Sequence, residues 1–161
     1  MVPYTLNEQI LEKYIFSLLK GIFMSRTIAL VACVSKKNES PMSARDLYIS
    51  DWFLKASAYA DRISDQWFIL SAKYGLLDPD DVIDPYDETL NKMPVKARRD
   101  WAVRVQDELI PQLNYGDQLV ILAGMKYREF LVDPLGASGY QVEIPMEGLR
   151  IGEQLSWLSN N

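Results

Sequence analysis

The sequence predicts a single-domain α/β protein with a Rossmann-like fold: a mainly parallel four-stranded sheet, flanking helices, and a further helix at the N-terminus. Two observations predict this class. Apolar segments alternate with amphipathic segments four times along the 161 residues, and this alternation is typical of parallel sheets. The chain also has no internal repeat, low-complexity tract or linker, so one domain accounts for its length.

We expect residues 5–23 to form an amphipathic helix, because apolar residues recur there at helical spacing. These residues are Leu11, Tyr14, Ile15, Leu18 and Ile22. Met24 would be a natural start in front of the first strand, so the preceding segment is either an appended helix or upstream sequence included by an early start codon. We therefore divide the chain into residues 1–23, an N-terminal helix or extension, and residues 24–161, the α/β domain.

The expected strands are short, and the first three are almost entirely apolar. The first, residues 27–34, is rich in β-branched residues, which indicates a strand buried on both faces of the sheet. The other expected strands are residues 67–72, 118–123 and 140–144. Helices are expected after Ser50, which is a good N-cap, after Pro94, which suits a first helical turn, and over residues 125–132 and 149–158.

Composition excludes several classes of function. The chain has no histidine, which excludes His-dependent triads and His-containing metal sites, and we expect neither a metal nor a cofactor. A net charge of −5 and a pI of about 4.8 make it a poor default binder of duplex DNA. The single cysteine, Cys33, fits a reducing cytoplasm. No segment has the length of a transmembrane helix, so we expect no membrane association.

A ligand site is expected at the carboxyl ends of the strands, where open parallel sheets bind their ligands. Cations, hydroxyls, glycines and aromatic rings gather at these ends, and this set suits a small anionic ligand with a flat ring, such as a nucleotide. Lys36 and Lys37 follow the first strand, for example. The expected ligand-binding residues are Ser35, Lys36, Ser43, Arg45, Tyr48, Ser71, Gly75, Tyr86, Gly124, Tyr127 and Gly148.

Three further residues are candidates for catalysis: Glu147, Lys73 and Tyr74. Glu147 is the best lone carboxylate for acid–base or nucleophilic work. Simpler interpretations stay open for most of the site. Arg45 can form a surface ion pair with its neighbour Asp46, and the residues around Tyr74 can simply close a strand. Cys33 can be a small buried hydrophobic residue.

Several motifs resemble a known family. They are Ala44-Arg45-Asp46-Leu47-Tyr48, the run LSAKYGLLDP at residues 70–79, and Asp84-Pro85-Tyr86. Over roughly residues 27–158 the chain resembles a small YaaA-like family of unassigned function. It is partly similar to the longer YaaA peroxide-stress family, which binds DNA and limits oxidative damage. The shared positions are Leu70, Ser71, Tyr74, Gly75, Leu77, Pro85 and Tyr86. The resemblance implies a shared fold and a shared site, but supplies no reaction.

Three functions therefore compete. The first is an enzyme acting on a nucleotide or modified nucleobase, with the glycosidic bond as a candidate, in which Arg45 and Lys36 hold phosphate and Tyr48 or Tyr74 stacks on the base. The alternative is a nucleic-acid-binding stress-response protein without catalysis, supported by the resemblance and by the basic residues between Lys96 and Arg104. The third is a non-catalytic module that forms a homo-oligomer through its N-terminal helix.

Overall fold

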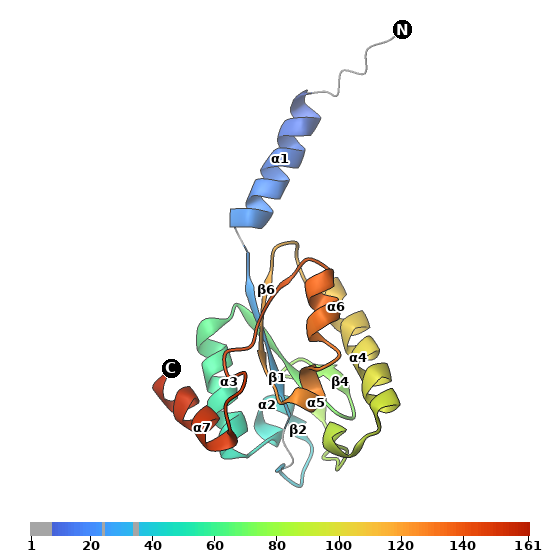
Figure 1. The fold of residues 1–161 in the computed structure, drawn as a ribbon, viewed down its shortest axis with the longest axis vertical. Helices are drawn as coiled ribbons and strands as arrows, with labels where there is room; N and C mark the ends of the chain where they lie inside the picture. The colour runs from blue at the N-terminus through green and yellow to red at the C-terminus, as the bar shows by residue number, and fades with distance from the viewer. Residues whose placement is uncertain (1–7, 24, 34–35) are drawn as a thin grey trace.

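The computed structural model describes residues 8–23, 25–33 and 36–161 (Figure 1). Its centre is a five-stranded sheet with the strand order β4-β3-β1-β6-β7. Four neighbouring strands are parallel: β3 (Gln66–Ser71), β1 (Thr27–Ala32), β6 (Gln118–Leu122) and β7 (Gln141–Glu143). They match the expected strands closely. The predicted α/β class and mainly parallel sheet are therefore confirmed.

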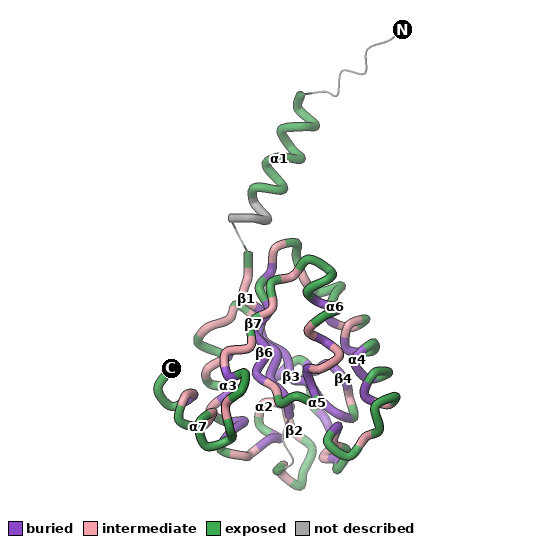
Figure 2. Tube along the Cα trace, in the orientation of Figure 1, coloured by how far each residue is buried: buried purple, intermediate pink, exposed green. Residues whose placement is uncertain are grey.

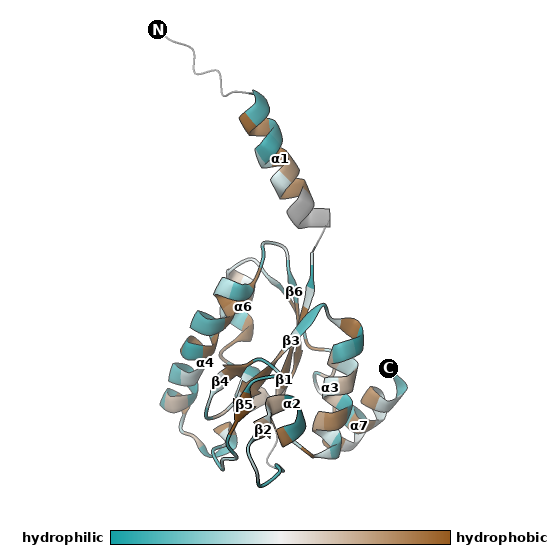
Figure 3. Ribbon diagram, turned by 180° about the vertical axis from the view of Figure 1, so that it is seen from behind, coloured by the Kyte–Doolittle hydropathy of each residue, from teal (hydrophilic) through white to brown (hydrophobic). Residues whose placement is uncertain are grey.

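The core is centred on β1, which pairs with β3 on one side and β6 on the other. Residues Ile28 to Ala32 are all buried, because helices cover both faces of the sheet at this strand. Figure 3 shows the strands as the most hydrophobic part of the chain, with hydrophilic residues on the outer surfaces of the helices. The continuous apolar pattern of residues 27–32 thus has the cause expected for a central parallel strand.

The helices form two layers, one on each face of the sheet (Figures 1 and 3). The first layer contains α3 (Asp51–Ile63) and α7 (Ile151–Asn160), and the second contains α4 (Val95–Leu109), α5 (Met125–Arg128) and α6 (Val132–Ala137). Short 3₁₀ turns occur at η1 (Leu90–Lys92) and η2 (Ile110–Gln112). Ser50 caps α3 as predicted, because its Oγ accepts a hydrogen bond from the Phe53 N–H at 3.1 Å.

The segment between β3 and α4 contains two further short strands. β4 (Gly75–Leu77) turns back and pairs antiparallel with β3, and β5 (Val82–Ile83) pairs with β2 (Met42–Ser43), which precedes α2 (Ala44–Leu47). Gly75 makes the return possible, because its φ of 76° is unfavourable for any other residue. Leu76 and Leu77 are buried on the edge of the sheet, which is the physical reason that this short stretch folds as a strand.

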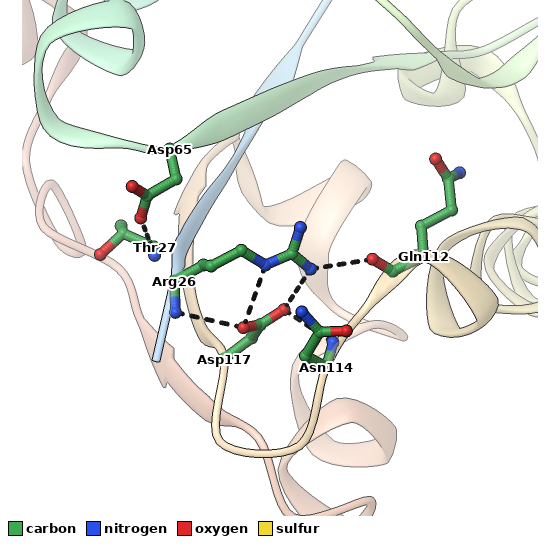
Figure 4. Close-up of polar contacts among 6 residues, drawn as sticks. All are labelled: Arg26, Thr27, Asp65, Gln112, Asn114 and Asp117. Carbon is green, nitrogen blue, oxygen red and sulfur yellow. Dashed lines mark hydrogen bonds and ion pairs between the residues drawn. The ribbon is translucent and has the colours of Figure 1, made fainter. Parts of the chain in front are cut away.

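A polar clamp holds the beginning of β1 at the N-terminal edge of the sheet (Figure 4). The carboxylate of Asp117 is fully buried. It accepts hydrogen bonds from the Arg26 backbone N–H at 3.2 Å, the Arg26 guanidinium at 2.7 Å and the Asn114 N–H at 2.8 Å. Beside it, Asp65 accepts from the Thr27 N–H at 2.8 Å. These bonds join the starts of β1, β3 and β6.

The helix α1 (Glu8–Phe23) precedes this edge and extends away from the body of the protein (Figure 1). Residues 8–19 are all exposed (Figure 2), including the apolar Leu11, Tyr14, Ile15 and Leu18 of the expected stripe. Residues 5–7, Met24 and the side chain of Ile22 lie outside the described part. None of the helices in the described ranges has the length and hydropathy needed to cross a membrane. Self-assembly through α1 stays a prediction.

Candidate functional site

The order of the strands locates a switch point between β1 and β6. From β1 the chain continues through α3 to β3 on one side, and then returns through α4 to β6 on the other side of β1. At such a point the connections leave in opposite directions, and a crevice opens beyond the carboxyl ends of the two strands. Cys33 directly follows β1, and Gly124 and Tyr127 follow β6. These residues therefore meet where an α/β sheet binds ligands.

A cavity of about 630 Å³ lies at this position, and we call it the switch-point cavity. It is lined by Cys33, Lys37, Asp87, Glu88, Thr89, Asn91, Lys92 and Tyr127. A smaller hollow of about 260 Å³ adjoins it and shares Lys37 and Asp87. The larger volume falls within the range of small-molecule sites.

The floor of the switch-point cavity is buried and only weakly polar. Cys33 and Tyr127 are 5% and 7% exposed, and the Cys33 thiol lies 3.5 Å from the Tyr127 hydroxyl. That hydroxyl also accepts a hydrogen bond from the Leu90 N–H at 3.4 Å. The Tyr127 and Trp101 rings are nearly perpendicular, with ring centroids 5.7 Å apart. The floor thus offers a fixed aromatic ring, a hydroxyl and a thiol.

The rim of the cavity is polar and comes mainly from one segment, residues 87–92. Asp87, Glu88, Asn91 and Lys92 are exposed there. The Leu90 N–H anchors this segment to Tyr127 on the floor, and the buried Leu90 side chain holds η1 against the core. A charged rim is therefore fixed over a weakly polar floor, which is a common arrangement in ligand sites.

Three tyrosines beside the cavity form what we call the tyrosine cluster: Tyr48, Tyr74 and Tyr86. The Tyr86 hydroxyl lies 2.6 Å from the Tyr48 hydroxyl and accepts a hydrogen bond from the Ser71 Oγ at 2.7 Å. The Ser71 Oγ in turn accepts from the Tyr74 N–H at 3.0 Å. The Lys37 ammonium lies 4.4 Å from the centroid of the Tyr86 ring, a favourable cation–π distance. The cluster connects β3 to the segment that forms the rim.

The phenols around Cys33 remain protonated at neutral pH. Burial raises the pKa of Tyr48, Tyr86 and Tyr127 well above the usual value, and the neighbouring Cys33 thiolate, where it forms, raises it further. These hydroxyls therefore serve as hydrogen-bond donors and acceptors. None of them is suited to act as a general base near pH 7.

The structure brings several of the expected site residues together. Tyr48, Ser71, Tyr74 and Tyr86 form one hydrogen-bonded group, and Gly75 makes the turn that follows it. Tyr127 forms the floor of the cavity. Gly124 is the N-cap of α5 and has no atom within 4 Å of where a Cβ would lie. Ser35 lies outside the described residues.

Arg45 and Ser43 are not part of this group. The Arg45 Nε donates to Asp80 at 3.0 Å, and its guanidinium lies 5.7 Å from the Trp67 ring, near the beginning of β3. Ser43 donates to Asp46 at 2.7 Å. Arg45 therefore lies toward the opposite end of β3 from the cavity. The surface ion pair left open for Arg45 does form, but its partner is Asp80 instead of Asp46.

The remaining expected residues also lie outside the cavity lining. The Glu147 side chain is 63% exposed and pairs with Arg128 at 3.3 Å, next to Gly148, whose φ is 79°. Lys73 is exposed, with its ammonium 5.3 Å from the Tyr74 ring. Lys36 is exposed, and its backbone carbonyl accepts from the Ile49 N–H. The three proposed catalytic residues, Glu147, Lys73 and Tyr74, are thus separate from the cavity lining.

Most residues of the rim were not among the site residues predicted from the sequence. Asp87, Glu88, Thr89, Asn91 and Lys92 belong to a polar stretch without a motif, so composition alone predicts a solvated loop. Their proximity to Tyr127 arises because residues 84–93 cross the carboxyl edge of the sheet. No three carboxylate or cysteine side chains within the described ranges are grouped closely enough to hold a metal ion.

The fold is that of a single-domain α/β protein, and a cavity lies at its topological switch point. Comparison with known families shows that the chain belongs to the Family of unknown function (DUF6884), whose model matches residues 28–160. A curated relative is the uncharacterized protein YfjM of Bacillus subtilis (strain 168), which is 32% identical over 123 residues, or 69% of this chain and 78% of the relative. No solved structure matches the chain.

Proposed function

We propose that the protein binds a nucleotide or modified nucleobase in the switch-point cavity and acts on it as an enzyme. The observation that carries this proposal is the coincidence of three features at one place. They are the β1–β6 switch point, a cavity of about 630 Å³, and a floor formed by Tyr127 and Cys33. A flat heterocycle fits a floor with one fixed aromatic ring and two weakly polar groups.

The rim supplies the groups that recognise the edges of such a ring. Thr89 and Asn91 each combine a donor and an acceptor on one side chain. Lys37 and Lys92 contribute ammonium groups, and Asp87 and Glu88 contribute carboxylates. Because a base edge alternates donors and acceptors, this mixed set supports base recognition better than a purely cationic set would.

For a reaction at the glycosidic bond, the carboxylates of the rim are the best-placed acid–base groups. Such a reaction needs a carboxyl group within reach of the leaving base or of the attacking water. Asp87 and Glu88 line the cavity, whereas Glu147 pairs with Arg128 outside it. In this proposal one rim carboxylate accepts a proton from the attacking water as the glycosidic bond breaks, and the departing base takes its proton from solvent.

The proposal is tested by thermal-shift measurements with a panel of free bases, nucleosides and nucleotides. A ligand at 100 times its Kd stabilises the folded state by about 2.7 kcal/mol, which is readily measured. Asn91→Ala should weaken binding of the stabilising compound. Asn160→Ala, an exposed amide on α7, is the matched control and should not. If no compound in the panel stabilises the wild type, the proposal is wrong.

The nucleic-acid alternative has less support from the geometry, because the basic residues of α4 are engaged within the protein. Lys96 pairs with Asp100 and Arg98 with Glu129, while Arg104 donates to the Lys73 carbonyl. The nucleic-acid alternative is supported by the resemblance to the YaaA family. Three of the positions shared with that family, Ser71, Tyr74 and Tyr86, contact one another. Retention on single- or double-stranded DNA at low salt, decreasing as salt rises, would favour this alternative.

A further inference from the structure

Within the proposed function, on which this inference rests, we propose that the switch-point cavity selects uncharged ligands. It would bind the free base or the nucleoside in preference to the corresponding 5′-phosphate. The proposed selectivity for uncharged ligands rests on the charge balance of the cavity lining and on the position of the Asp87 and Glu88 carboxylates.

The lining residues carry equal numbers of positive and negative groups. Lys37 and Lys92 are cationic, Asp87 and Glu88 are anionic, and no arginine is among the lining residues. A phosphate monoester carries a charge of about −1.5 to −2 at neutral pH. It would have to be placed in the same cavity as two carboxylates, and like charges brought together discriminate against a ligand. A neutral ligand is not repelled electrostatically by these carboxylates.

The cations are also not arranged as a phosphate clamp. The Lys37 ammonium lies 4.4 Å from the centroid of the Tyr86 ring and 5.6 Å from that of Tyr48, so it is directed at the tyrosine cluster. Lys92 is an exposed residue at the end of η1. The helix that follows β6 has only four residues, too few for a strong helix dipole. The usual features of a phosphate site are therefore lacking in the described lining.

The rim carboxylates instead suit a pair of sugar hydroxyls. A carboxylate offers acceptors only, and a ribose diol offers two donors. Acidic residues at the edge of α/β sheets accept hydrogen bonds from ribose hydroxyls in this way. With the base against Tyr127, the ribose of a nucleoside would face the exposed Asp87 and Glu88. The mobile 5′-substituent would then meet negative charge.

The test compares each of the four common ribonucleosides with its 5′-monophosphate and its free base by isothermal titration calorimetry at constant ionic strength. For the best-bound base we expect the nucleoside to bind at least about 10-fold more tightly than the monophosphate, an effect of the size expected for one unfavourable charge contact. The double variant Asp87→Asn/Glu88→Gln should reduce this ratio to near one or reverse it.

The matched control is Asp133→Asn/Glu143→Gln, which removes the same net charge from exposed positions outside the lining and should leave the ratio unchanged. Tighter binding of the monophosphate by the wild type would overturn the inference and leave the proposed function intact. An equal change in both double variants would also overturn it, because the effect would then come from net charge. If no compound binds, the proposed function fails, and this inference fails with it.

Discussion

The clamp at the start of β1 provides the sharpest test of what holds this fold together. Asp117→Asn keeps the size and shape of the side chain but removes its charge. It also places an amide N–H₂ where one carboxylate oxygen accepts bonds from the Arg26 guanidinium and the Asn114 N–H (Figure 4). Because Asp117 is fully buried, water does not reach its carboxylate, and only the exposed part of Arg26 can be hydrated instead. We therefore expect a large loss of stability from an isosteric change.

The expected magnitude follows from the burial of the two partners. Breaking a fully buried ion pair costs about 3–5 kcal/mol. The Arg26 side chain remains 29% exposed, so water relieves part of the cost, and we expect the free energy of unfolding to fall by about 2–3 kcal/mol. For a domain of this size, each kcal/mol lowers Tm by about 2–4 °C. Urea unfolding followed by tryptophan fluorescence would measure the change directly.

The pH dependence of this difference has a definite sign. Burial alone would raise the pKa of Asp117, but hydrogen bonds from Arg26 and Asn114 outweigh it and hold that pKa below its usual value. A depressed folded-state pKa stabilises the protein above the unfolded pKa, and this stabilisation is lost as pH falls through the folded pKa. The difference between wild type and Asp117→Asn should therefore be full near pH 7 and shrink below about pH 4.

Asp65→Asn is the matched control, because Asp65 lies beside the clamp and accepts a bond from the Thr27 N–H without an arginine partner. Asp65 is exposed, and we expect its loss to cost about 0.5–1 kcal/mol. Equal losses for the two variants, or a loss for Asp117→Asn that does not change between pH 7 and pH 3, would refute the reasoning.

Three further expectations test other parts of the structure. Tyr86→Phe should lower the free energy of unfolding by about 1–3 kcal/mol, because it leaves buried hydroxyls without a partner. The control Tyr115→Phe, at an exposed position, should cost almost nothing. Because the pKa of the buried phenols is raised in the folded state, stability should also be lost as pH rises above about 10, and less steeply in Tyr86→Phe. Gly75→Ala should cost about 1–2 kcal/mol because of its positive φ, in contrast to Gly136→Ala, where no atom lies within 4 Å of the added Cβ; equal costs would contradict this. Deleting residues 1–23 should change the urea midpoint of the α/β domain little, because residues 8–19 are exposed; a large loss would show that the helix supports the body.

The three central parallel strands, β3, β1 and β6, could be predicted because nearly every position in them is buried. Residues 28–32 face covered layers on both sides, so every position is apolar and the pattern needs no knowledge of partners. β4 could not be predicted in the same way, because Leu76 and Leu77 are its only apolar side chains. Gly75 does indicate a turn, but a three-residue strand depends on the sheet edge that is already present.

The site was predictable where residues directly follow strands and not where they come from loops. Ser71 ends β3, and Tyr127 lies in the helix just after β6, so the topology alone brings them to the carboxyl edge. Arg45 lies elsewhere because its N–H donates to the Pro79 carbonyl at 2.9 Å and the neighbouring Ala44 N–H donates to the Asp81 carbonyl at 2.7 Å. These bonds join segments about 35 residues apart, and no local pattern indicates them.

The helix α1 enters the domain at the edge where β1 begins, and the switch-point cavity opens at the edge where β1 ends. The helix α1 and the mouth of the switch-point cavity are therefore separated by the length of the central strand. A fluorophore, an affinity tag or a surface tether attached before Glu8 would leave the mouth of the cavity accessible. Ligand screening on immobilised protein is thus practical through the N-terminus, whereas attachment through Lys92 or Lys37 would modify the cavity itself.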